Sequence, residues 1–190
     1  YFKLAFAVIP ALVLGYLFDD KIEAVLEKPI PIAIAMIIGG VVLLFIDKFF
    51  QNPIKIKDEQ ITYKNAITIG FWQCLAMMPG TSRSAASIIG GMQQGLTLKL
   101  AAEFSFFLAV PTMLAASAKS TLDVYQSNPE VFASDNLLII SIGAIVAFIV
   151  ALLSVQFFIK IVQKQGFAIF GWYRIILGTT LLILLFNHWI

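Results

Sequence analysis

Residues 137–161 form an apolar run whose one charged member is Lys160, and no other feature of the sequence constrains the fold more. A bilayer requires a spanning helix to have about 20 predominantly apolar residues. Across all 190 residues, 60% are hydrophobic and 13% are charged, against roughly 25% charged residues in an average soluble domain. The net charge is only +2 and the basic residues are scattered, which argues against a nucleic-acid partner. We therefore expect an all-α integral membrane protein.

The other long apolar runs predict about five transmembrane helices within one transmembrane domain that covers residues 1–190. The candidate spans are residues 4–18, 30–46, 100–118, 137–161 and 167–186. Polar residues 19–28 are predicted to end the first helix, and residues 119–136 to form a polar linker. The first run is slightly short and the chain begins with Tyr1 rather than Met, so we expect an N-terminally truncated chain.

Two shorter apolar stretches, residues 66–78 and 85–92, are each too short to cross a bilayer. Between them lies the polar tip Pro79-Gly80-Thr81-Ser82-Arg83-Ser84. We expect a re-entrant helical hairpin at about residues 66–92, with its tip near mid-membrane and surrounded by protein or water. This arrangement gathers most lysines on one side of the membrane and most acids on the other. By the positive-inside rule the lysine-rich side is cytoplasmic. The lysines on that side are Lys3, Lys48, Lys55, Lys57, Lys64, Lys99, Lys160 and Lys164, while Lys21, Lys28 and Lys119 lie opposite.

Arg83 is the most informative residue of the tip. A charge at the centre of a bilayer costs about 2.5–3.5 kcal/mol on insertion scales, so such a residue indicates a function. Arg83 stands between Ser82 and Ser84 at the predicted start of a helix, where backbone N–H groups favour anions. A guanidinium group also binds phosphate oxygens in a bidentate manner. The pattern predicts a phosphate or diphosphate site; alternatively, the hydroxyls only cap the helix and Arg83 snorkels or pairs with an acid.

Three further polar residues in apolar surroundings have two interpretations each. Gln73 either hydrogen-bonds the tip or makes an interhelical contact. Arg174 either snorkels to the aromatic belt or binds an anionic head group. Glu103 either pairs with Lys99 or balances the charge of Arg83.

The run Gly70-Phe71-Trp72-Gln73-Cys74-Leu75-Ala76-Met77-Met78-Pro79-Gly80-Thr81-Ser82-Arg83-Ser84 resembles the second signature of the bacterial undecaprenyl-diphosphate phosphatases, the bacitracin-resistance protein family. The match continues through Gly90-Gly91-Met92, residues 101–111 and Tyr173-Arg174. The resemblance implies a multi-pass enzyme of the bacterial inner membrane that hydrolyses undecaprenyl diphosphate to undecaprenyl phosphate and phosphate. This reaction recycles the lipid carrier for peptidoglycan synthesis and confers bacitracin resistance. The family fold has two inverted repeats, each with a re-entrant hairpin, and this chain corresponds to the second half.

The resemblance also implies which residues form the site. The catalytic residues would be Arg83, Ser82 and Ser84, acting mainly by positioning and by stabilising charge on the transferring phosphoryl group. The diphosphate would be bound by Gly80, Thr81 and Arg83, with Arg174 and Gln73 as further candidates.

The sequence departs from the family in its first signature, a glutamate-rich segment followed by hydroxyl residues and a histidine. Nothing in the chain matches it: the sole histidine, His188, lies at the C-terminal end, and Cys74 is the sole cysteine. A divalent cation, Mg or Ca, is implied by the resemblance, but we expect its ligands outside this chain. We predict no phosphatase activity if the chain is complete; if it is a fragment, the missing piece lies before Tyr1. Ala85 replaces a glycine that is frequent in the family.

Other classes of protein remain open on the sequence alone. A phosphate-lipid transporter or flippase would also use inverted repeats with broken helices around an anion site. The phosphatidic-acid-phosphatase superfamily places a histidine where this chain has Ile89, which argues against it. A purely structural membrane subunit would leave the cluster around Arg83 without a reason. The oligomeric state is also open, a homo-oligomer included.

Overall fold

The computed structural model describes residues 2–26, 29–50, 53–54, 57–132 and 134–187. These residues form seven α-helices, three 3-10 helices and no β-strand. The elements are α1 (Phe2–Leu26), α2 (Pro29–Phe49), η1 (Asp58–Gln60), α3 (Tyr63–Cys74), η2 (Leu75–Met77), α4 (Arg83–Gln93), α5 (Leu98–Ser127), η3 (Pro129–Phe132), α6 (Ser134–Gln165) and α7 (Ala168–Phe186). The predicted all-α class is therefore confirmed.

Four of the described helices are long and apolar enough to cross a membrane. They lie at Pro29–Ile46, Leu98–Ser127, Asn136–Gln165 and Ala168–Phe186, and the apolar part of α1, Phe2–Phe18, is shorter. None of the span in α6 is buried inside the protein, although it is the most apolar of the four. An apolar helix with that much exposed surface belongs in lipid, so the chain is a multi-pass membrane protein.

Two predicted boundaries are wrong. Helix α1 continues to Leu26 instead of ending near Asp19. The segment that follows Asp19 is polar overall, but its Lys, Glu, Ala and Leu residues all favour helix. The predicted linker at 119–136 is largely helical, since α5 runs to Ser127 and α6 begins at Ser134. Helix α5 ends where Pro129 disfavours the helical conformation of the preceding residue, Asn128.

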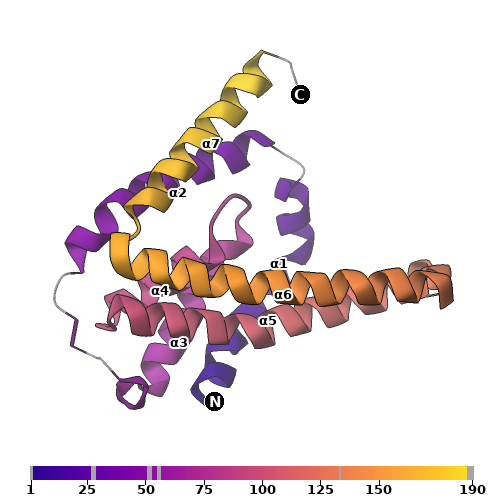
Figure 1. Cartoon of the computed structure of the whole chain (residues 1–190), viewed down its shortest axis with the longest axis horizontal. Helices are drawn as coiled ribbons and strands as arrows, with labels where there is room; N and C mark the ends of the chain where they lie inside the picture. Colours follow the sequence, from indigo (N-terminus) through magenta and orange to yellow (C-terminus); the bar gives the residue numbers. More distant parts are fainter. Residues whose placement is uncertain (1, 27–28, 51–52, 55–56, 133, 188–190) are drawn as a thin grey trace.

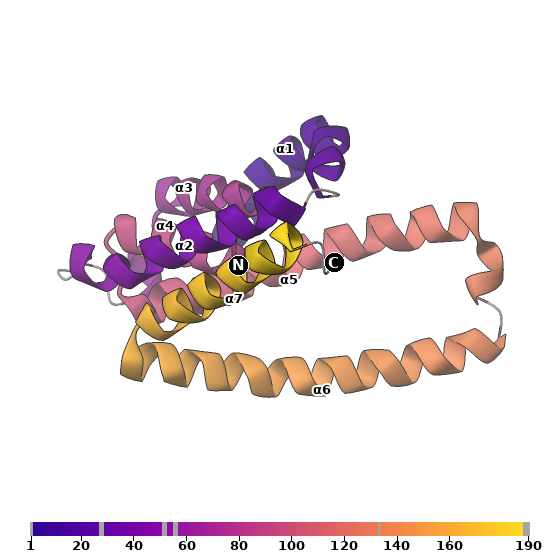
Figure 2. The ribbon, with the colours of Figure 1, turned by 90° about the horizontal axis from the view of Figure 1, so that it is seen from above.

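The helices pack in two groups (Figure 1). Helices α2 and α7 lie against each other, and α1, α3, α4 and α5 surround the buried core. This core includes Ile69, Ile88 and Leu108, each at most 1% exposed. Seen from above, α6 runs apart from α5 along much of its length (Figure 2). The α2–α7 pair packs closely because Gly40 and Gly171 face each other across it, leaving no side chain between the backbones.

The predicted hairpin at residues 66–92 is present as the helix–turn–helix unit α3–η2–α4. Thr62 caps α3 in a reciprocal capping box with Asn65. The two arms are joined by the indole Nε1 of Trp72, in the last turn of α3, which donates to Oε1 of Gln93 over 2.7 Å. Gly70 on the first arm packs directly on the backbone of Ala7 in α1. These contacts place the hairpin inside the helical group; its re-entrant course through a bilayer stays a prediction.

The contact between Gly40 and Gly171 can be tested with a bulkier residue. A Cβ atom at Gly171 would lie 2.8 Å from the carbonyl oxygen of Gly40. We expect Gly171→Val to lower the free energy of unfolding by about 1–3 kcal/mol, measured by thermal or denaturant unfolding in detergent. The matched control is Gly143→Val in α6, where an added Cβ meets no atom within 4 Å. Equal destabilisation of the two variants would contradict this account of the α2–α7 packing.

Candidate active site

The hairpin tip has a backbone conformation that depends on glycine. Gly80 has φ +84°, a region that side chains rarely allow, and a Cβ atom there would collide with the carbonyl oxygen of Ile32 in α2. The hydroxyl of Thr81 turns back into the tip, where it donates to the carbonyl oxygens of Leu75, over 2.6 Å, and of Met78. Thr81 and Gly80 therefore fix the turn that precedes α4.

Arg174 reaches this turn from α7. Its Nη2 donates to the carbonyl oxygen of Gly80, and its Nε is buried without a hydrogen-bond partner among the described residues. Gly39 leaves the necessary space, because a Cβ there would lie 2.9 Å from Nη2 of Arg174. The side chain thus anchors the tip to the α2–α7 pair. Its predicted role in binding an anionic head group stays a prediction.

Arg83 begins α4 directly after the tip and lines a cavity of about 530 Å³. The residues that line this cavity are Ala11, Leu12, Gly15, Tyr16, Gln73, Ala76, Met77, Arg83, Thr112, Ala115, Ala116 and Lys119. Nη1 of Arg83 and Oε1 of Gln73 are buried and have no hydrogen-bond partner among the described residues. A buried polar group without a partner costs about 1–3 kcal/mol, so two of them at one cavity indicate a polar ligand.

The serines at the start of α4 lie beside this cavity without lining it. Ser82 caps the helix, because its Oγ accepts a hydrogen bond from the backbone N–H of Ala85 over 3.3 Å. The same Oγ lies 3.3 Å from Oγ of Ser84. Below them, the fully buried Ser87 hydrogen-bonds the hydroxyl of Ser105 in α5 over 2.6 Å. The capping role proposed for these hydroxyls is confirmed for Ser82, and α4 is fixed to α5 one turn below Arg83.

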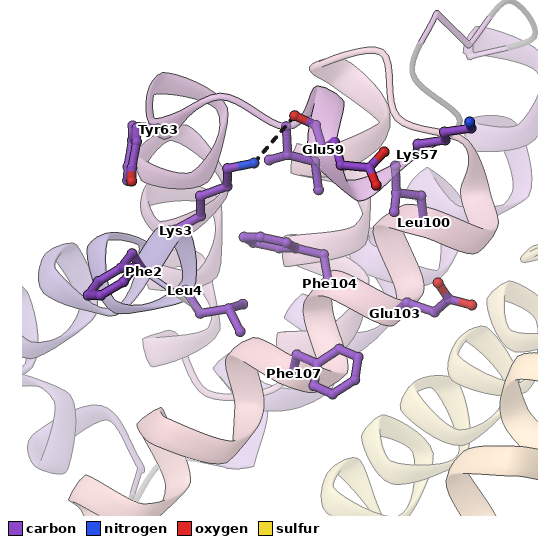
Figure 3. A pocket seen from close by; sticks show the side chains of 11 residues that line it. Phe2, Lys3, Leu4, Lys57, Glu59, Tyr63, Leu100, Glu103, Phe104 and Phe107 are labelled. Carbon is purple, nitrogen blue, oxygen red and sulfur yellow. Dashed lines mark hydrogen bonds between the residues drawn. The ribbon is translucent and has the colours of Figure 1, made fainter.

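Glu103 does not line the cavity that Arg83 lines. Its carboxylate lies 3.9 Å from Nζ of Lys99 on the same helix, so the interpretation as a local ion pair is confirmed. Glu103 lines a different cavity of about 860 Å³, near the start of α1 (Figure 3). That cavity also contains Lys3, whose Nζ donates to the carbonyl oxygen of Glu59 over 3.4 Å. It combines acidic, basic and aromatic side chains and shares no lining residue with the Arg83 cavity.

The side chains at the Arg83 cavity suit an anion rather than a metal ion. Its described lining contains two cations, Arg83 and Lys119, and no carboxylate, whereas Mg²⁺ and Ca²⁺ bind through carboxylate and other oxygen ligands. The described residues also contain no group of three or more His, Cys, Asp or Glu able to hold a metal. His188 lies outside the described residues. The divalent cation that the family resemblance implies therefore has no fitting site among the residues at this cavity.

The structure thus brings together only part of the predicted site. Gln73 and Arg83 line one cavity, while Gly80, Thr81, Ser82, Ser84 and Arg174 form or hold the tip beside it. Lys119 was missed by the sequence analysis because it falls in the segment read as a polar linker. Its spacing of seven residues from Thr112 on one helix, which places both on the same face, is the signal that could have found it.

Several apolar helices, with Arg83 and Gln73 lining one cavity among them, define an integral membrane protein with a polar cavity between its helices. Comparison with known proteins gives the family: residues 1–180 match the family model described as "Bacitracin resistance protein BacA". The chain belongs to this family.

Curated relatives agree with this assignment. The protein of Flavobacterium johnsoniae named "Undecaprenyl-diphosphatase" is 52% identical, over 98% of this chain and 70% of the relative. That of Flavobacterium psychrophilum, with the same name, is 50% identical over 98% and 70%. "Undecaprenyl-diphosphatase 3" of Acinetobacter baylyi is 46% identical over 97% and 68%.

The anchoring role of Arg174 predicts a stability effect that needs no substrate. Arg174→Met would leave the carbonyl oxygen of Gly80 without this donor, and hydrogen bonds to charged groups contribute about 1.5–3 kcal/mol. We expect a lower thermal unfolding temperature in detergent for Arg174→Met, and a smaller decrease for Arg174→Lys, which retains a cationic donor. Lys164→Met, at an exposed position in the last turn of α6, is the control for loss of a positive charge. If Arg174→Met unfolds at the same temperature as that control, the anchor is not important for stability.

Proposed function

We propose that this protein hydrolyses undecaprenyl diphosphate to undecaprenyl phosphate and inorganic phosphate. The observation that carries the proposal is the buried guanidinium of Arg83, whose Nη1 has no partner among the described residues and which lines a cavity between membrane helices. A cavity between membrane helices is accessible to a lipid substrate, and the guanidinium group of Arg83 fits the oxygens of a diphosphate. The curated relatives reported above are named for this hydrolysis.

Arg83 stabilises the charge of the reacting phosphate. Overall, the hydrolysis consumes one water molecule: its oxygen becomes bonded to the terminal phosphorus, the bond from that phosphorus to the bridging oxygen breaks, the bridging oxygen leaves with undecaprenyl phosphate, and one proton of the water is released. Negative charge spreads over the equatorial oxygens during this transfer. A fixed guanidinium at the N-terminus of α4, inside apolar surroundings, stabilises that charge without first having to reorganise.

The groups around Arg83 position it and the substrate. Ser82 caps α4 and so fixes the backbone of the following residue, while the turn formed by Gly80 and Thr81 sets where this helix begins. Gln73 presents its side-chain amide to the same cavity as Arg83. We assign Gln73 to the orientation of the diphosphate, because the N–H groups of its side-chain amide can donate to phosphate oxygens.

The reaction places the protein in envelope synthesis. Undecaprenyl phosphate is the carrier lipid for peptidoglycan, so a protein that regenerates it belongs in the bacterial inner membrane, with the lysine-rich side in the cytoplasm. Removal of the diphosphate lipid also accounts for the bacitracin resistance in the family's description. No observation favours the phosphate-lipid transporter.

Substitution of Arg83 tests the proposed chemistry. Removing one preorganised donor to a transition-state anion typically costs roughly 10²–10³ in kcat. We expect Arg83→Ala to lose phosphate release from undecaprenyl diphosphate by at least about that factor, and Arg83→Lys to retain a fraction, because an ammonium keeps the charge but not the bidentate fork. Phosphate release is measured in detergent or liposomes with the full-length gene product. Hydrolysis by Arg83→Ala at the original rate would exclude the role given to Arg83.

Gln73 gives a test in which stability and activity move in opposite directions. Gln73→Met keeps the length of the side chain and removes a buried oxygen that has no partner among the described residues. We expect unchanged or higher thermal stability, together with slower phosphate release. A variant that is both less stable and fully active would show that Gln73 serves packing and not substrate.

A further inference from the structure

One face of α5 forms a wall of the Arg83 cavity. Thr112, Ala115, Ala116 and Lys119 all line it, and their spacing of three, four and seven residues is that of one helix face. With a rise of 1.5 Å per residue, Lys119 lies about 10 Å along the helix axis from Thr112. The cavity therefore extends along two turns of α5, and Lys119 stands at one end of this face.

Small residues make the room in this cavity. Ala11 and Gly15 face it from α1, Ala76 from η2, and Ala115 and Ala116 from α5. The volume of about 530 Å³ falls within the usual range for small-molecule sites, about 300–1,000 Å³. The cavity has space for a head group and for the first part of the chain attached to it.

The two cations of the cavity differ in burial. Arg83 is half-buried and its Nη1 is fully enclosed, whereas Lys119 is exposed. Lys119 therefore lies at an exposed part of the cavity wall, and Nη1 of Arg83 at an enclosed part. The described lining thus carries two positive charges, and phosphate oxygens bind such groups through charge-assisted hydrogen bonds.

Lys119 also differs from most other lysines in the side of the membrane on which it is predicted to lie. Most lysines are predicted to lie on the cytoplasmic side, whereas Lys119 is predicted to lie on the other side, where acids predominate. A lysine in this position is uncommon, and this one lines the cavity that holds Arg83.

We propose that Lys119 is a substrate-binding residue at the mouth of the cavity, where it attracts the diphosphate head group toward Arg83. The inference rests on the proposed hydrolysis for the identity of the ligand. An exposed charge at a mouth acts mainly on capture of the ligand, and its effect is screened by salt. Lys119 therefore contributes to KM, while Arg83 contributes to the chemical step and kcat.

The experiment compares Lys119→Met, Lys119→Arg and the control Lys99→Met. Lys99 lies on the same helix, is also exposed, and lines neither cavity. Phosphate release from undecaprenyl diphosphate is measured at low and high ionic strength. At low salt we expect Lys119→Met to raise KM about two- to fivefold, as for the loss of one exposed ionic interaction, with kcat unchanged. We expect Lys119→Arg and Lys99→Met to retain the original KM, and the original protein and Lys119→Met to converge at high salt.

A binding titration separates failure of this inference from failure of the proposed function. The same proteins are titrated with undecaprenyl diphosphate and with uncharged undecaprenol. Weaker binding of the diphosphate by Lys119→Met, with unchanged binding of undecaprenol, supports the role of Lys119 even if the protein releases no phosphate, an outcome that would refute only the hydrolysis. Equal KM values and equal diphosphate affinities for Lys119→Met and Lys99→Met at every salt concentration would overturn the inference. So would a KM increase that high salt does not reduce.

Discussion

The hydrogen bond from Arg174 to the carbonyl oxygen of Gly80 joins the two groups of helices at the hairpin tip. Gly80 adopts a conformation that other residues rarely allow, and it lies directly on the backbone of Ile32. At the depth in the bilayer that is predicted for this turn, bulk water does not satisfy the carbonyl groups, so a charged donor from another helix is especially valuable there. The position of Arg83, three residues farther along the chain, depends on this turn.

Much of the fold could be predicted from hydropathy, but the ends of the helices could not. The runs at 137–161 and 167–186 correspond to α6 and α7, and the interrupted apolar segment at 66–92 is the hairpin α3–η2–α4. Hydropathy reports which residues suit lipid, whereas a helix ends only where the backbone is interrupted. Residues 119–127 contain neither glycine nor proline, and the helix ends at Asn128, before Pro129. The polar linker predicted at 119–136 is wrong for this reason.

The site was predictable where local sequence carries the signal. Arg83 stands out because a charge within an apolar region is costly, and Gln73 because it shares the first arm of the same hairpin. The contact between Arg174 and Gly80 joins residues 94 positions apart, and no local pattern reveals it. Lys119 has a different explanation. Its place in a polar segment predicts a position outside the membrane, whereas the structure places it in the wall of the Arg83 cavity.

The tip is contacted by both groups of helices, which also share the buried core, since Leu43 and Ile46 of α2 belong to the same cluster as Ile69 and Leu108. Helices α2 and α7 hold Gly80 from one side through Ile32 and Arg174, while α4 is fastened to α5 by the hydroxyl pair of Ser87 and Ser105. The turn is therefore held in place by contacts from both groups of helices. A substitution in α2 or α7 that displaces Ile32 or Arg174 therefore also displaces the residues that directly precede Arg83.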